Sequence, residues 1–191
     1  VQGAVAFAGD SSAKAKGTLT ETSIPIESWQ LAELTWGEPG ENSAPQGQLI
    51  TTGGDPQMIL EDVSGRVVRT VSYNVEFDGD SREMCLYYTT KVGEPYSRDR
   101  RVFPETLPDG SYRYTLPRGP VVSLRLDPCS PEENRTVTFT MSDITLNAAD
   151  TLPAPWQYFV PGWYQAFCLV LYPALAAAAV SIVGAVVRKR K

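Results

Sequence analysis

Arginine and aspartate alternate with leucine in the segment Leu124-Arg125-Leu126-Asp127. In an extended strand alternate side chains share a face, so Arg125 and Asp127 lie on one face and the two leucines on the other. This spacing fits best a structural arginine–carboxylate pair, or Asp127 capping the next turn, and two polar contacts to a ligand are the alternative. The sequence leaves these interpretations open.

Aromatic side chains offer flat faces on which sugar rings can stack. Trp36, Tyr88 and Tyr96 are the aromatic residues we single out as candidates for such contacts. The competing interpretation is that they pack in the core or at its rim, as most aromatic residues of a β domain do. Together with Arg125 and Asp127 they form the candidate ligand-binding set.

Histidine is absent from the sequence, which excludes Ser-His-Asp and Cys-His catalysis and every histidine-containing metal site. The chain also has no Gly-rich phosphate loop, Cys-x-x-Cys motif or nucleophile elbow. We therefore expect a non-catalytic protein that holds no cofactor. One alternative is a structural Ca²⁺ bound by the acidic run that contains Glu76, Asp78, Asp80 and Glu83, although a solvated hairpin tip explains these residues better.

Three cysteines are present, at positions 85, 129 and 168. Cys85 and Cys129 could form a disulfide in an oxidising compartment, or they could remain two separate thiols. Cys168 lies inside the apolar C-terminal run, where it cannot readily meet the other two.

Charge is divided sharply along the chain. Every Asp and Glu lies at or before Asp150, so the first 187 residues carry 13 basic and 22 acidic side chains, a net charge of −9. An acidic domain repels a phosphate backbone, and we expect no nucleic acid partner.

A run of 22 uncharged residues extends from Ala166 to Val187. As a helix it would be ~33 Å long, enough to cross a hydrocarbon core of ~30 Å. Aromatic residues precede the run and the four basic residues 188–191 follow it. This pattern predicts a single-pass protein of the inner (plasma) membrane, with the N-terminal domain periplasmic or extracellular and the C-terminus cytoplasmic.

Small residues recur on the predicted membrane helix. Pro173 should kink it, because proline has no backbone N–H to donate. A face of small side chains would let another helix approach closely, so other transmembrane helices are expected partners beside lipid. The alternative is that alanine is merely common in such helices. The residues of this face are Ala174, Ala177, Ser181, Gly184 and Ala185.

Short β-prone runs alternate with turn signals before this anchor, which is typical of a sandwich or barrel. Val71, Tyr73, Val75 and Phe77 alternate with polar residues, so they should share a buried face. We predict an all-β, antiparallel, jelly-roll-like sandwich of about eight strands. The expected divisions are an extended leader over 1–27, the sandwich over 28–149, a linker with interfacial aromatic residues over 150–162, the transmembrane helix over 163–187 and a basic tail over 188–191.

Several short segments follow one another in a recognisable order. They are Gly54-Asp55-Pro56-Gln57-Met58-Ile59, Leu86-Tyr87-Tyr88, Tyr96-Ser97, Leu116-Pro117, Leu124-Arg125-Leu126-Asp127-Pro128, Val137-Thr138-Phe139 and Ile144-Thr145-Leu146. Residues 30–147 thereby resemble the β-sandwich accessory modules, of galactose-binding or jelly-roll type, of bacterial surface-polysaccharide membrane proteins, especially glycosyltransferases. The catalytic domain that usually accompanies such a module does not occur in this sequence. The resemblance implies a surface glycan as a partner.

Two functions follow as expectations. The first is an accessory or structural subunit of a larger membrane complex. The second is a carbohydrate-binding module in cell-surface polysaccharide assembly.

Overall fold

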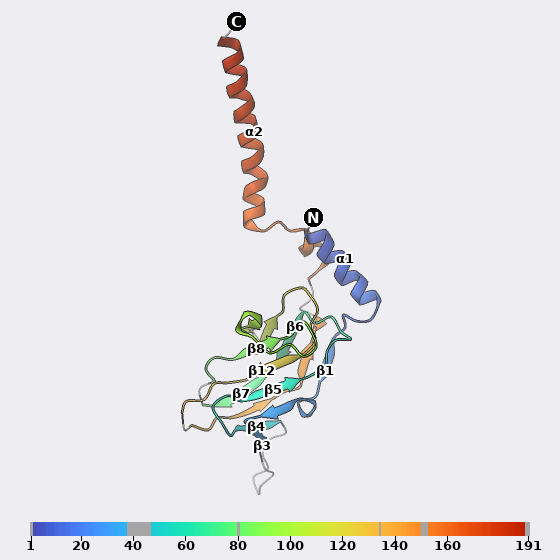
Figure 1. The fold of residues 1–191 in the computed structure, drawn as a ribbon, viewed down its shortest axis with the longest axis vertical. Helices are drawn as coiled ribbons and strands as arrows, with labels where there is room; N and C mark the ends of the chain where they lie inside the picture. Colours follow the sequence, from blue (N-terminus) through green and yellow to red (C-terminus); the bar gives the residue numbers. More distant parts are fainter. Residues whose placement is uncertain (1, 38–46, 80, 134, 150–152, 190–191) are drawn as a thin grey trace. The chain divides into compact units, whose positions relative to one another are not determined.

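The computed structural model describes residues 2–37, 47–79, 81–133, 135–149 and 153–189 (Figure 1). The chain divides into two compact units, one of Gly9–Leu152 and one of Val1–Ala8 with Pro153–Lys191. The first unit contains the strands and the second contains the long C-terminal helix.

The strands of the described residues form three antiparallel sheets, which together make a β-sandwich. Sheet A has the order β1 (Thr22–Ile24), β14 (Ile144–Leu146), β6 (Thr70–Tyr73), β11 (Tyr112–Thr115), β10 (Glu105–Thr106). Sheet B has the order β2 (Gln30–Ala32), β5 (Gln57–Leu60), β12 (Leu124–Asp127), β8 (Cys85–Tyr88), β9 (Arg101–Val102). Sheet C has the order β3 (Leu34–Trp36), β4 (Gln48–Thr51), β13 (Thr138–Met141), β7 (Val75–Asp78). Short 3-10 helices occur at η1 (Ile26–Ser28), η2 (Arg98–Arg100) and η4 (Pro155–Phe159).

Sheets A and C are two parts of one bent layer. The chain passes from β6 to β7 at Asn74 and from β13 to β14 at Ser142, and β6 pairs with β14 as β7 pairs with β13. The amide of Asn74 donates to Ser142 Oγ, and the amide of Ser142 donates to the carbonyl of Asn74, both at 2.9 Å. A bend of this kind carries a long strand from one sheet to the next.

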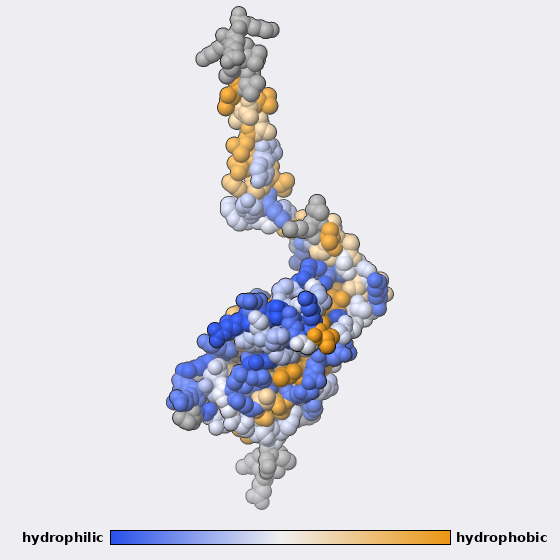
Figure 2. Space-filling view, viewed as in Figure 1, coloured by the Kyte–Doolittle hydropathy of each residue, from blue (hydrophilic) through white to orange (hydrophobic). Residues whose placement is uncertain are grey.

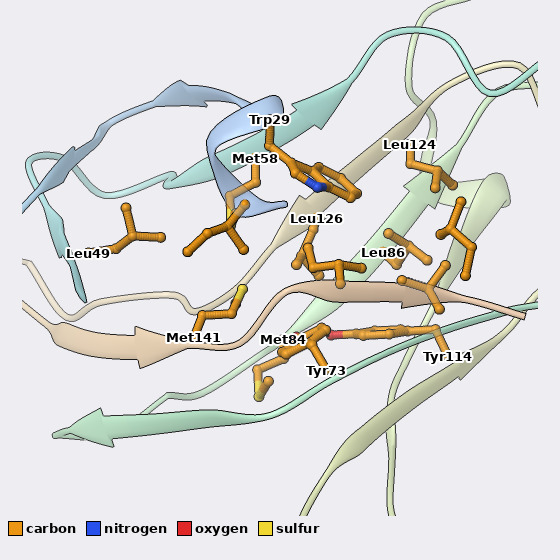
Figure 3. Close-up of a cluster of buried hydrophobic side chains, with 14 of the residues drawn as sticks. Trp29, Leu49, Met58, Tyr73, Met84, Leu86, Tyr114, Leu124, Leu126 and Met141 are labelled. Carbon is orange, nitrogen blue, oxygen red and sulfur yellow. The ribbon is translucent and has the colours of Figure 1, made fainter. Parts of the chain in front are cut away.

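The core lies between sheet B and this bent layer. Figure 3 shows Met58, Leu86 and Leu126 of sheet B facing Tyr73 and Tyr114 of sheet A. The two tyrosine hydroxyls share a hydrogen bond of 2.9 Å, which satisfies both polar groups inside the core. The predicted all-β sandwich is confirmed.

The buried face predicted for residues 71–77 is confirmed along β6 and β7. Val71 and Tyr73 are buried, while Val75 and Phe77 are partly buried and pack against the core. These alternating residues belong to two strands, β6 and β7, because the backbone changes sheet at Asn74.

The N-terminal segment differs from the extended leader expected over 1–27. Residues Gln2–Ala15 form helix α1, and β1 already belongs to sheet A. Five of the fourteen residues of α1 are alanine, the residue with the highest helix propensity. The segment has little apolar periodicity, and for that reason the sequence pattern did not reveal it.

The C-terminal helix α2 runs over Trp163–Lys189 and contains Pro173. Its segment Trp163–Ile182 is long and apolar enough to cross a membrane, and none of that segment is buried within the protein. The apolar surface of α2 is visible in Figure 2. The helix expected over 163–187 is therefore present, and α2 is a candidate membrane span.

Candidate functional site

Arg125 and Asp127 lie side by side on the outer face of sheet B, as their spacing predicts. Arg125 Nε donates to Asp127 Oδ1 at 2.7 Å, and Nη2 donates to Oδ2 at 2.8 Å. Nη2 also contacts Asp55 Oδ1 at 3.0 Å, from the turn before β5. Such a two-pronged contact between guanidinium and carboxylate is the strong form of the interaction.

Two further side chains extend this cluster across the sheet. Arg125 pairs in register with Tyr87 on β8, and Tyr87 pairs with Arg101 on β9. The guanidinium carbons of Arg125 and Arg101 lie 5.1 Å and 5.9 Å from the centre of the Tyr87 ring. The Arg101 guanidinium also lies 4.7 Å from the ring centre of Phe103. These are cation–π distances, and the two guanidinium groups lie over the Tyr87 ring, which a sugar would otherwise use.

Burial and the neighbouring positive charge shift the pKa of Asp127 in opposite directions. Burial raises the pKa of Asp127, and the adjoining Arg125 guanidinium opposes that rise. The Cys85 thiol donates to Asp127 Oδ2 at 3.9 Å. The polar atoms of the pair are therefore satisfied within the sheet, and the parts of the cluster open to a ligand are Asp55 and the exposed Phe103 ring.

Of the three predicted aromatic residues, Tyr96 lies beside this cluster: burial raises the pKa of Tyr96, and the nearby Arg125 guanidinium opposes that rise. Trp36 lies on β3, an edge strand of sheet C, with 37% of its surface exposed. Tyr88 packs against the core, on the opposite face of sheet B from Arg125. The Tyr96 hydroxyl donates to Ser123 Oγ at 3.1 Å. The candidate ligand-binding set is thus divided among three places.

Cys85 and Cys129 are buried thiols rather than the disulfide that the sequence allowed. Cys85 is drawn to Asp127 on sheet B, whereas burial alone raises the pKa of Cys129. The two side chains occupy different environments.

The small residues of the predicted packing face lie on α2, where Ala174, Ala177 and Ser181 are exposed. Ser181 Oγ donates to the carbonyl of Ala177 at 2.9 Å, so its hydroxyl is satisfied within the helix. Gly184 and Ala185 belong to the helical backbone, and their side-chain surroundings lie outside the described part.

The acidic run considered for Ca²⁺ lies in part on β7, which carries Glu76 and Asp78. Asp80 lies outside the described residues. Within the described residues, no group of three or more His, Cys, Asp or Glu side chains is arranged to hold a metal ion.

A polar pocket of about 230 Å³ opens on sheet A, at a place that the sequence did not indicate. Polar residues of β6, β11 and β14 form it together with turn residues. The alternation of Ser72 with its buried neighbours predicted an outward side chain, but the pairing of β6 with β11 and β14 was not visible in the sequence. The lining residues are Glu21, Ser72, Tyr73, Asn74, Leu107, Asp109, Ser111, Arg113, Ser142, Asp143, Thr145 and Ala148.

The fold and the helix define a class of protein, a β-sandwich joined to a C-terminal apolar helix that is a candidate membrane span. No family model and no curated protein matches the sequence. Several solved structures are similar to it, among them the following two. One is a low-affinity xylan-binding module, CBM86, from the gut symbiont Roseburia intestinalis, at 14% identity and a TM-score of 0.41 over 66% of this chain and 94% of that one. The other is the K2 cleaved adhesin domain of Lys-gingipain, at 13% identity and a TM-score of 0.42 over 66% of this chain and 99% of that one.

Proposed function

We propose that the chain is a non-catalytic, single-pass membrane protein that serves as an accessory or structural subunit of a larger membrane complex. The observation that carries this proposal is the segment Trp163–Ile182 of α2, which is apolar and of which no part is buried. A helix with this much apolar surface requires lipid or another protein around it.

The flanks of α2 support insertion in one direction. Trp156, Trp163 and Tyr164 are exposed near its start, where aromatic rings suit the headgroup region. The basic residues 188–191 follow its end. In the proposed arrangement the sandwich lies on the periplasmic or extracellular side, and the basic end stays in the cytoplasm.

The small residues of α2 support a partner helix. Ala177 and Ser181 are one turn apart, and the Ser181 hydroxyl is already bonded to its own helix. The side chains there are short, so the backbone of another helix can approach closely and gain van der Waals contact.

Extraction in mild detergent followed by size analysis and identification of the co-purifying chains tests this proposal. We expect an assembly larger than the chain alone, and we expect Ala177→Leu with Ser181→Leu to weaken it. Ala176→Leu with Val180→Leu is the matched control on another face of the helix, and it should leave the assembly intact. A monomer from the unaltered chain would contradict the subunit role.

A second function, carbohydrate binding in cell-surface polysaccharide assembly, is favoured by the polar pocket on sheet A. Its lining combines hydroxyl, carboxylate, amide and guanidinium residues, which are the groups that bind sugar hydroxyls. The full chain applied to an array of cell-surface glycans tests this function. Failure to bind any glycan, at adequate coverage, would count against it.

A further inference from the structure

The pocket on sheet A is built on one row of polar residues. Thr145 on β14 pairs with Ser72 on β6, and Ser72 pairs with Arg113 on β11. Paired residues lie on the same face of a sheet, so two hydroxyls and one guanidinium lie next to one another on the outer face. The neighbouring register positions carry the buried Val71 and Tyr114, which point into the core.

The hydrogen-bonding groups of this row suit a ligand with several hydroxyl groups. Arg113 can only donate, whereas Ser72 and Thr145 can both donate and accept. Ser72 Oγ is shielded from solvent and has no hydrogen-bond partner among the described residues. A ligand hydroxyl reaching this atom would satisfy a group that the fold leaves without a partner.

The charge of the pocket excludes an anionic ligand. Its lining includes three carboxylates, Glu21, Asp109 and Asp143, and a single guanidinium, Arg113. Hydrogen bonds from the hydroxyl and amide of Ser111 lower the pKa of Asp109, so it stays ionised near neutral pH. A phosphate or a uronic acid would meet net negative charge, whereas carboxylates accept readily from neutral hydroxyls.

The size of the pocket limits the ligand to one small ring. Its volume of about 230 Å³ lies below the roughly 300–1,000 Å³ that is usual for drug-sized ligands. Leu107 supplies an apolar contact beside the polar groups, which matches the C–H face of a sugar ring.

We propose that the pocket on sheet A binds a single neutral sugar unit, with Arg113, Ser72 and Thr145 as its central contacts. This proposal rests on the carbohydrate-binding function above and gives that function a location. The site lies on sheet A, whereas Arg125 and Asp127, which the sequence singled out, lie on sheet B.

Ligand-observed NMR on the full chain in lipid nanodiscs tests the site. Nanodiscs are chosen because maltoside detergents carry sugars of their own. The probes are glucose, galactose, mannose and xylose, with glucuronate as the anionic counterpart of glucose. We expect saturation transfer to at least one neutral sugar and none to glucuronate.

Variants then locate the binding. Arg113→Gln and the nearly isosteric Thr145→Val should each weaken the affinity for the neutral sugar at least tenfold, with Asp143→Asn as a further variant at an exposed position. Arg101→Gln makes the same change on the outer face of sheet B, and Phe103→Ala removes the exposed ring there. Both controls should leave the affinity within twofold. Thermal melting verifies that each variant is folded.

Two different results would overturn the proposal. Sugar binding that survives all three pocket variants but is lost in Arg101→Gln or Phe103→Ala would place the site on sheet B, and the carbohydrate-binding function would stand. If no neutral sugar gives saturation transfer, the pocket site fails, whereas the carbohydrate-binding function fails only if the glycan array is silent as well; the subunit role is unaffected in both cases.

Discussion

Arg125 is the residue on which the outer face of sheet B depends. Its guanidinium donates to both carboxylate oxygens of Asp127 and to those of Asp55. Arg125→Met keeps most of the side-chain volume but leaves Asp127, which is 8% exposed, as an uncompensated buried charge. We expect the free energy of unfolding to fall by ~3 kcal/mol in urea denaturation.

Two further variants make this prediction specific. Arg125→Met with Asp127→Leu removes both charges and should recover most of the loss, whereas Arg98→Met in an exposed 3-10 helix should change stability by less than ~0.5 kcal/mol. A loss below ~1 kcal/mol for Arg125→Met would show that the pair behaves as an ordinary surface ion pair.

The two buried thiols should make the sandwich sensitive to alkaline pH. Burial raises the pKa of Cys85 from 9.0 to about 11 and that of Cys129 to about 12. The unfolded chain loses these protons at lower pH than the folded chain, so the unfolded state binds fewer protons and the free energy of unfolding falls as pH rises above 9.0.

Melting temperatures measured across this alkaline range check the effect. We expect a shallower decline in the double variant Cys85→Ala and Cys129→Ala, and the parent slope in Cys168→Ala. An unchanged slope in the double variant would mean that other groups control alkaline unfolding.

Residue spacing in the sequence predicted side-chain neighbours only within a single strand. It predicted that Arg125 and Asp127 share a face, since both lie on β12. It could not reveal Asp55, Tyr87 or the pocket around Ser72, because these depend on which strands are neighbours and in what register. Register is set by packing of the whole sandwich, which no local pattern encodes.

At the scale of elements, apolar alternation identified the sandwich strands, and the structure changed their limits. The segments around Asn74 and Ser142 have continuous β patterns, yet each divides where the layer bends. Helix α1 was not predicted at all, for a different reason. Its alanines favour a helix but do not produce an apolar face that a sequence pattern could reveal. The sequence therefore led to the prediction of an extended leader, although the alanine content of the segment favours a helix.

Helix α1 depends on one buried aspartate in its second half. Asp10 is 2% exposed and accepts from Arg69 Nε at 3.2 Å and Arg118 Nη1 at 2.8 Å. An alanine-rich helix of 14 residues is only marginally stable by itself in water. We expect Asp10→Ala to speed amide hydrogen exchange over residues 9–16, with protection of β6 and β12 retained.

Ser11→Ala is the matched control for this experiment, because the neighbouring Ser11 is exposed. It should leave exchange over residues 9–16 unchanged. Retained protection in Asp10→Ala would show that contacts other than the two arginines hold this part of the helix.

At the scale of the whole molecule, charge and hydropathy divide the chain in the same place. Every carboxylate precedes α2, and the last four residues are basic. The sandwich contributes a closed core of its own, while the segment Trp163–Ile182 contributes an apolar surface that the chain does not cover. An acidic sandwich and an uncovered apolar helix are together what the proposed anchored arrangement requires.

The basic tail should set the orientation of the proposed membrane protein. Basic residues are retained on the cytoplasmic side, so the sandwich should be digested by protease added to sealed right-side-out vesicles, while an epitope placed after Lys191 stays protected. Replacing residues 188–191 by glutamine should mix the orientations, and moving the four basic residues to a position before Trp163 should invert them. Permeabilised vesicles, in which the epitope is digested, provide the control. Digestion of the epitope in sealed vesicles, with the sandwich protected, would reverse the proposed orientation and place the pocket on sheet A in the cytoplasm, away from any surface glycan.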